Sequence, residues 1–177
     1  MFLNPEQNIA ILGLHEGMHV ADFGSGTGFY TMAAAKKVGN SGKVFSIEVQ
    51  KDLLKALESN IKDAHLSNVE CIWGDIEKIN GTKLNSGSMD AIIISNVLFQ
   101  AEDKLGLIDE AKRILKKDGK ILLVDWNESY GGMGPAPHHV VSEKESIDMF
   151  KKRDFKIIEK ISNLSHHYGI IFELVSR

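Results

Sequence analysis

The sequence predicts a single α/β domain in which helices cover both faces of a mostly parallel, doubly wound sheet. Apolar runs bounded by turn residues alternate with stretches of helical periodicity, which is the pattern of repeated strand-helix units. The apolar run AIII at residues 91–94 is nearly continuous, as expected for a strand covered on both faces. A length of 177 residues, 43% of them hydrophobic, suits one domain spanning residues 1–177.

The first half of the chain begins with an expected helix. Asn4 is its N-cap, and Pro5 takes the first helical position. Gln7 is placed to complete a capping box, and the helix should end near Gly13. Further elements are then expected, namely strands at 18–23, 43–47 and 69–73 and helices at 27–38 and 51–64.

The second half continues the alternation with a strand at 90–95, a helix at 103–117 and a strand at 120–125. Lysines in the last turn of the helix and Gly119 beyond it suggest a C-terminal cap there. Residues 127–141 are the long irregular stretch, and loops of this length in compact domains are commonly functional lids.

The tail of the chain departs from the strand-helix pattern. Ser142 with Glu145 resembles a capping box that opens the last helix. Two β-rich runs follow, at 155–161 and 168–175, and only six residues join them. Because six residues are too short for a helical crossover, the two runs must pair as an antiparallel hairpin.

The bulk composition narrows the class of protein. The formal charge of −3 and pI near 6.2 disfavour a nucleic-acid partner, since binding to phosphates draws on clustered lysine and arginine. No apolar run approaches the ~20 residues of a membrane span. The start of the chain lacks a secretory signal pattern, and the single Cys71 cannot form an internal disulfide, so we expect a cytoplasmic protein.

A glycine-rich loop stands between the first expected strand and the next helix. VADFGSGTGFY places Gly24, Gly26 and Gly28 where missing Cβ atoms let the backbone turn sharply and approach a ligand. The dinucleotide fingerprint wants a third glycine three residues after the second, but that position is Phe29. The loop therefore predicts a nucleotide-type ligand, and Phe29 disfavours NAD as that ligand.

Acidic residues at successive strand ends sharpen this prediction. Glu48 lies 24 residues after Gly24, at the end of the second strand, and Asp75 lies just after the third. The carboxyl ends of adjacent strands line one crevice in a doubly wound sheet. A carboxylate there can accept both ribose hydroxyl protons, a second can meet an adenine amino group, and Asp22 can meet an ammonium end.

The segments VADFGSGTG, FSIEV, GDIEK, DAIIISNVLFQ and GKILLVDW occur in the order and spacing of class I S-adenosylmethionine-dependent methyltransferases. The chain resembles this family over nearly its whole length, and most of all the small branch related to ubiquinone and menaquinone biosynthesis methyltransferases. The resemblance implies a Rossmann-like sheet of seven strands in the order 3-2-1-4-5-7-6, with an antiparallel seventh strand. It also implies S-adenosylmethionine as the cofactor.

The resemblance assigns roles to particular residues. The glycine loop lies under the methionine part of the cofactor, Glu48 binds the ribose, and Asn96 lines the methyl-transfer crevice. Val49 meets the adenine face, and Asp75 with Ile76 meets its edge. The full predicted set of cofactor contacts is Asp22, Gly24, Ser25, Gly26, Gly28, Glu48, Val49, Asp75, Ile76 and Asn96.

The acceptor is less clearly marked than the cofactor. Phe99 and Gln100 stand where quinone-type enzymes often have histidines, and the tetrad of base-amino methyltransferases is absent after the fourth strand. A small-molecule acceptor is therefore expected. Candidate walls for it are Phe99, Gln100, Trp126 and Tyr168, with Tyr130 as a further aromatic.

Methyl transfer is an in-line displacement, so a general base is needed only if the acceptor must lose a proton. Two histidine pairs are the candidates, His138 with His139 in the expected lid and His166 with His167 before the last strand. Surface polar residues are an equally good interpretation of both pairs. No ligand set with metal-site spacing is recognisable.

Two other functions remain open at this stage. One is a non-catalytic protein that binds S-adenosylmethionine as part of an assembly, and the other is a nicotinamide-dependent oxidoreductase, which Phe29 disfavours. The sequence leaves the oligomeric state and the accepting atom undetermined.

Overall fold

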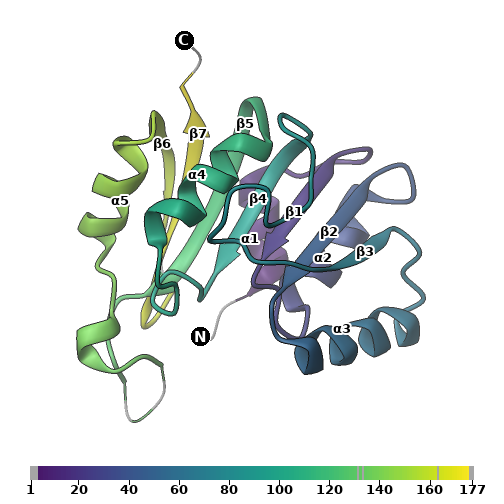
Figure 1. Cartoon of the computed structure of the whole chain (residues 1–177), viewed down its shortest axis with the longest axis horizontal. Coiled ribbons are helices and arrows are strands. Elements are labelled where there is room, and N and C mark those ends of the chain that lie inside the picture. The colour runs from purple at the N-terminus through teal and green to yellow at the C-terminus, as the bar shows by residue number, and fades with distance from the viewer. Residues whose placement is uncertain (1–3, 131, 133, 163, 176–177) are drawn as a thin grey trace.

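The computed structural model describes residues 4–130, 132, 134–162 and 164–175. Seven strands form one sheet in the order β3-β2-β1-β4-β5-β7-β6 (Figure 1). β1 to β5 pair in parallel, and β7 runs antiparallel to both β5 and β6. The predicted strand order and the antiparallel seventh strand are confirmed.

The strands and the α-helices agree with the sequence-based expectations in number and order, whereas the short helix η1 was not expected. The strands are β1 (His19–Phe23), β2 (Lys43–Glu48), β3 (Val69–Trp73), β4 (Met89–Ser95), β5 (Leu115–Trp126), β6 (Phe155–Ile161) and β7 (His167–Leu174). The helices are α1 (Pro5–Leu12), α2 (Phe29–Val38), α3 (Lys51–Asp63), α4 (Lys104–Ile114), the short 3-10 helix η1 (Pro137–His139) and α5 (Glu143–Lys151).

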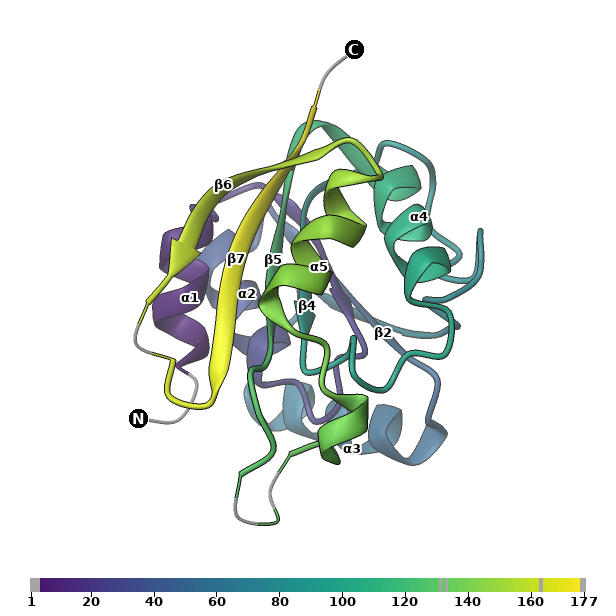
Figure 2. The ribbon, with the colours of Figure 1, turned by 90° about the vertical axis from the view of Figure 1, so that its left-hand side faces the viewer.

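Two hydrophobic cores lie on opposite faces of the sheet. Figure 2 shows α1 and α2 on one side and α4 and α5 on the other. Alternate residues of β4 divide between them, because successive side chains of a strand point to opposite faces. Ala91 and Ile93 pack with α1 and α2, and Ile92 and Ile94 pack with α4 and α5. The apolar run of β4 is thus buried on both faces, as predicted.

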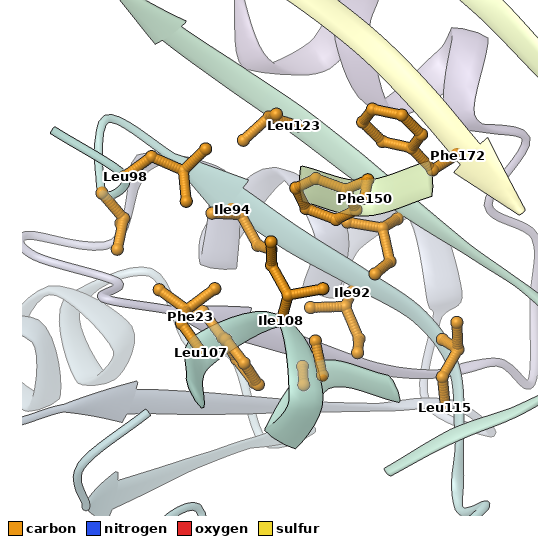
Figure 3. Packing of buried hydrophobic residues seen from close by; sticks show 14 of the residues in the cluster. Phe23, Ile92, Ile94, Leu98, Leu107, Ile108, Leu115, Leu123, Phe150 and Phe172 are labelled. Atoms are coloured by element: carbon orange, nitrogen blue, oxygen red, sulfur yellow. The ribbon is translucent and has the colours of Figure 1, made fainter. Parts of the chain in front are cut away.

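The larger core gathers side chains from distant parts of the chain (Figure 3). Phe150 of α5 stacks on Phe172 of β7 with 4.3 Å between ring centroids. Leu107 and Ile108 of α4 lie over Phe23 at the end of β1. This packing fixes the ends of the central strands, near which the residues predicted to bind the cofactor lie.

The expected helix at 103–117 is too long. α4 ends at Ile114, and β5 starts at Leu115, which pairs with Met89 at the edge of β4. Lys116 then reaches Asp90, with 2.7 Å between Nζ and Oδ1. The sheet therefore takes over the residues whose lysines resembled a helix end, and Gly119 lies within β5 instead of capping α4.

The helix boundaries follow their local caps elsewhere. Asn4 accepts a hydrogen bond from the Gln7 amide at 3.2 Å, and the capping box of Ser142 and Glu145 is present. α2 starts at Phe29, two residues later than expected, because Gly28 takes a left-handed conformation. The expected hairpin forms between β6 and β7.

The expected lid at 127–141 contains η1, whereas residues 131 and 133 within it lie outside the described residues. Residues 1–3, at the start of the predicted domain, and 176–177, at its end, do so as well. In the part of the chain that the structure covers, every helix is too short or too polar to cross a membrane.

Candidate active site

Two neighbouring hollows lie at the carboxyl edge of the sheet. The first, of about 390 Å³, is lined by Pro5, Asp22, Gly24, Ser25, Gly26, Thr27, Phe29, Tyr30, Ser95, Asn96 and Gln100. The second, of about 260 Å³, is lined by Gly24, Gly26, Ile47, Glu48, Val49, Gln50, Leu53, Gly74, Asp75, Ile76, Glu77, Val97, Gln100 and Ala101. Gly24, Gly26 and Gln100 belong to both, so one elongated ligand can occupy the pair.

The glycine loop between β1 and α2 separates the two hollows. Gly24 has φ +64°, and a Cβ built there would lie 2.8 Å from the Cγ2 atom of Val97. Gly28 has φ +90°, and its Cβ would collide with Leu57 of α3. The loop can follow this path only with glycine at these positions, since side chains rarely adopt this backbone and would not fit.

Asp22 lies at the floor of the first hollow and is almost fully buried. Its Oδ2 atom accepts a 2.6 Å hydrogen bond from the Thr31 hydroxyl, which lies 2.6 Å from the Ser46 hydroxyl. Burial raises the pKa of Asp22 to about 7, although the bond from Thr31 opposes this shift. A cationic group in the hollow would favour the ionised carboxylate.

Two further polar atoms in the first hollow are buried and lack a partner. Ser25 Oγ and Asn96 Oδ1 make no hydrogen bond with the described part of the chain. Asn96 also has φ +57°, a conformation that side chains seldom adopt. Because buried polar groups are normally paired, these atoms are suited to a polar ligand group.

Glu48 lies at the end of β2, on the wall of the second hollow. Its Oε2 atom accepts a hydrogen bond from the Gly26 amide at 3.0 Å, and its Oε1 atom accepts one from the Gln50 amide at 2.9 Å. Each carboxylate oxygen can accept more than one hydrogen bond, so both keep capacity for ligand hydroxyls. The carboxylate therefore holds the glycine loop and remains able to bind a diol.

Asp75 stands beside Glu48 in the same hollow. Its Oδ1 atom accepts from the Glu77 amide at 3.0 Å, and Oδ2 lies 2.8 Å from Lys78 Nζ. The hydrogen bond from Lys78 lowers the pKa of Asp75, so this carboxyl is ionised at neutral pH. Val49 is 58% exposed at the rim, which leaves an apolar face free for a flat ligand.

The segment after β3 is held by a residue that the sequence analysis did not single out. Glu110 of α4 is fully buried and accepts hydrogen bonds from the Asn80 amide at 2.9 Å and the Thr82 hydroxyl at 2.6 Å. Arg113 pairs with the same carboxylate at 2.7 Å. An acid spaced three residues before an arginine on a helix is usually a surface pair, so the pattern gave no sign of burial.

Comparison with known proteins decides the family. A family model described as "Methyltransferase domain" matches residues 14–172, which is most of the chain. The chain belongs to the methyltransferase domain family. The resemblance seen in the sequence is confirmed, and with it S-adenosylmethionine as the cofactor and the class of S-adenosylmethionine-dependent methyltransferases.

Similar methyltransferases include enzymes of quinone biosynthesis. Demethylmenaquinone methyltransferase of Geobacillus sp. (strain WCH70) is 26% identical over 123 residues, which cover 70% of this chain and 51% of that protein. Ubiquinone/menaquinone biosynthesis C-methyltransferase UbiE of Shewanella oneidensis is 26% identical over 157 residues, 88% of this chain and 57% of that protein. The chain spans about half the length of the curated relatives it matches.

A solved methyltransferase structure extends the similarity to nearly the whole fold. A SAM dependent methyltransferase from Aquifex aeolicus has a TM-score of 0.89 and 28% sequence identity, covering 98% of this chain and 91% of that one. The family assignment decides against the nicotinamide-dependent alternative. The methyltransferase domain brings together most of the cofactor residues expected from the sequence.

The structure distributes the expected cofactor residues over both hollows. Asp22, Gly24, Ser25, Gly26 and Asn96 line the first, and Glu48, Val49, Asp75 and Ile76 line the second together with the two shared glycines. Gly28 is the exception, because it is the N-cap residue of α2 and lies against Leu57. Gln100, expected at the acceptor, lies between the hollows.

The expected acceptor and base residues lie elsewhere. Phe99, His138 and His139 line a third hollow beside α5, together with Lys104 and Lys152. His167 and Tyr168 line a fourth hollow near the start of β7. The structure therefore does not bring these five residues to the glycine loop.

The remaining candidates pack against one another at the end of β5. Trp126 lies against the His167 ring, with 4.1 Å between centroids. His166 stacks on Tyr130 at 3.7 Å, and its Nδ1 atom lies 2.8 Å from Glu128. Burial lowers the pKa of His167. These contacts connect the segment after β5 to the start of β7.

The single cysteine has no place in this chemistry. Cys71 is half-buried in β3, and burial raises its pKa to about 11. The thiol is therefore protonated at neutral pH and is a poor nucleophile.

Proposed function

We propose that this chain transfers a methyl group from S-adenosylmethionine to a small apolar acceptor of quinone type, bound beside the cofactor at the carboxyl edge of the sheet. The observation that carries the proposal is the pair of connected hollows, which share Gly24, Gly26 and Gln100. One hollow carries acids suited to an adenosine, and the other combines buried polar atoms with an apolar rim.

The residues present fit the two ends of the cofactor. The unpartnered Ser25 Oγ and Asn96 Oδ1 would meet the carboxylate and ammonium of the methionine part, and Asp22 would pair with the ammonium. Glu48 would accept the ribose hydroxyls, and Asp75 would meet the adenine amino group. Val49 would contact the adenine face, and Ile76 would meet its edge beside Asp75.

The rim of the first hollow supports an apolar acceptor. Phe29 is 71% exposed although it is a large aromatic residue, and it stands at the start of α2 on this hollow. Pro5 and Tyr30 line the same hollow. An exposed aromatic beside a cavity provides area that a ring-bearing molecule would cover. The names of the curated relatives, which act on demethylmenaquinone or serve ubiquinone and menaquinone biosynthesis, favour a quinone-type ring.

The chain's contribution to the reaction would be positioning. When bound, S-adenosylmethionine supplies a methyl group on a positively charged sulfur, open to displacement in line with the carbon-sulfur bond. The protein would then hold the acceptor opposite that bond and exclude water, which is worth several orders of magnitude in rate. Histidines do not occur among the described residues that line the two hollows, so no histidine is assigned as a base.

Calorimetry followed by turnover tests the proposal. The protein is titrated with S-adenosylmethionine and with S-adenosylhomocysteine, and is then incubated with a water-soluble demethylquinol under reducing conditions. We expect micromolar binding of both compounds and release of S-adenosylhomocysteine that depends on the quinol. Absence of binding at millimolar ligand contradicts the cofactor site, and binding without turnover supports the non-catalytic alternative.

A further inference from the structure

The turn after β4 forms a wall that the two hollows share. Asn96 and Gln100 line the first hollow, and Val97, Gln100 and Ala101 line the second. The turn is tight, because the amides of Gln100 and Ala101 both bind the carbonyl of Val97, at 3.0 and 3.1 Å. The position of this turn therefore decides the width of both hollows.

A buried carboxylate of the neighbouring strand β5 binds the backbone amides at the start of this turn. Asp125, near the end of β5, is fully buried, and its Oδ2 atom accepts a 2.8 Å hydrogen bond from the Leu98 amide. The amides of Val97 and Phe99 lie close enough to lower its pKa as well. Its Oδ1 atom accepts from the Trp126 amide at 2.8 Å. Successive amides that converge on one anion form a nest, which stabilises negative charge.

The turn packs against the glycine loop, so the position of the turn affects the position of the loop. Val97 packs so tightly on Gly24 that a Cβ there would lie 2.8 Å from its Cγ2 atom. Gln100 donates a 2.8 Å hydrogen bond to the carbonyl of Asn96, which fixes its side chain between the hollows. A turn released from Asp125 would shift Val97, Gln100 and Asn96 together.

We propose that Asp125 is a positioning residue for cofactor binding, which acts by holding the turn 97–101 against the glycine loop. The inference rests on the proposed function, since it assumes that the cofactor occupies both hollows. Asp125 itself is not among the described residues that line either hollow. The sequence shows Asp125 only as a polar residue at a strand end, and its partners in the turn lie 26 to 28 residues earlier.

Because the charge of Asp125 depends on pH, its hold on the turn 97–101 should depend on pH as well. Burial raises its pKa to about 6, against the lowering effect of the four amides. The turn amides favour the ionised carboxylate, so release of the turn with Asp125 still buried in the sheet would raise its pKa further. Protonation therefore favours the released turn, and the turn should loosen as the pH falls through this value. Tyr168 of β7 is the residue opposite Asp125 in the sheet. The negative charges of Glu143 and Glu145 on α5 contribute to raising the pKa of Tyr168. Burial raises the pKa of Tyr168, so its phenol stays neutral in this range.

The test compares wild-type protein with Asp125→Asn, which keeps the volume but removes the charge. S-adenosylhomocysteine is titrated by calorimetry at pH 8.0, 7.0 and 5.5. We expect the variant to bind about tenfold more weakly at pH 8.0, because two or more amides lose a charged acceptor. The ratio of the two dissociation constants should narrow to about threefold or less at pH 5.5, where wild-type Asp125 is mostly protonated.

Asp63→Asn is the matched control, because it removes one acid from the exposed end of α3. It should bind like wild type at each pH. A ratio for Asp125→Asn that stays constant with pH, or equal affinities at pH 8.0, overturns the proposal. If the wild type binds S-adenosylhomocysteine and Asp125→Asn binds it equally well, the proposed function stands and this inference alone fails.

A measurement on the wild type guards against a variant that does not fold. Amide hydrogen exchange at residues 97–99, corrected for the intrinsic effect of pH, should show lower protection at pH 5.5 than at pH 7.5. The titration of Asp22 does not account for such a change, since Asp22 accepts from Thr31 and not from the turn. Equal protection at the two pH values contradicts the role of Asp125.

Discussion

The two hollows of the site differ in how far their polar groups are already satisfied. In the second hollow, both carboxylate oxygens of Glu48 accept hydrogen bonds from backbone amides. One oxygen of Asp75 does the same, and the other pairs with Lys78. In the first hollow, Ser25 and Asn96 have buried polar atoms that find no partner among the described residues, and burial raises the pKa of Asp22 to about 7. The acids of the second hollow are held by the chain itself, whereas the first hollow keeps polar atoms that are free to bind a ligand.

This difference matches the chemistry of the two ends of the cofactor. A ribose and an adenine are neutral, so fixed carboxylates suffice to align their hydroxyl and amino groups. The methionine end carries both an ammonium and a carboxylate, and such charges bind strongly only where buried partners await them. The first hollow should therefore supply most of the pH dependence of binding, and the second should supply alignment.

Asp22→Asn should have the largest effect on cofactor binding, and the effect should come from the first hollow. The variant should bind S-adenosylhomocysteine about 30-fold to 100-fold more weakly at pH 8, because the ammonium loses a buried charge-assisted hydrogen bond. Wild-type affinity should rise between pH 6 and pH 8 as Asp22 ionises, since the ligand prefers the charged form. Calorimetry across this range measures both effects. A variant that keeps the wild-type rise near pH 7 would contradict the assignment.

The same substitution should make the empty protein more stable. The folded pKa of Asp22 lies above its unfolded value, so ionisation costs the folded state free energy. That cost is complete above about pH 7 and shrinks as the pH falls toward 4. Asp22→Asn should thus raise the free energy of unfolding by on the order of 1 kcal/mol at pH 8, with a smaller gain at pH 5. Urea denaturation at both pH values measures it.

Glu48→Ala should weaken binding by ~1 to 3 kcal/mol, or about 5-fold to 150-fold, through loss of the ribose bonds and of the acceptor for the Gly26 amide. The affinity of Glu48→Gln, which keeps one carbonyl acceptor, should lie between those of Glu48→Ala and the wild type. Calorimetry with S-adenosylhomocysteine measures both. The pH dependence from Asp22 should survive in each, and unchanged affinity in Glu48→Ala would refute the ribose assignment.

The fold was predictable because its signals are local. The apolar run of β4, the short link before β7 and the capping box at Ser142 each specify one element without reference to the rest of the chain. The end of α4 was not, since the lysines after Ile114 are equally compatible with a last helical turn. Pairing of Leu115 with Met89 decides the matter, and a sheet partner cannot be read from a helix pattern.

The site divides in the same way. Residues that follow strand ends, such as Glu48 and Asp75, were predictable because parallel strands bring their carboxyl ends to one edge. The histidine pairs were placed by chemistry alone, and η1 carries His138 and His139 to the side of α5. Asp125 and Glu110 act through backbone amides of other segments, and such contacts leave no mark on the spacing of side chains.

The smallest expected effect concerns the acceptor, and it distinguishes the first hollow from the third. Phe29→Ala should raise the KM for a quinone-type acceptor about fivefold, because the ring contributes roughly 1 kcal/mol of apolar contact. The affinity for S-adenosylhomocysteine should change less than twofold, since Phe29 stands at the rim. Phe99→Ala is the control, because Phe99 lines the hollow beside α5. If instead Phe99→Ala raises the KM and Phe29→Ala does not, Phe99 is an acceptor residue, as the sequence suggested, and the acceptor binds in the hollow beside α5.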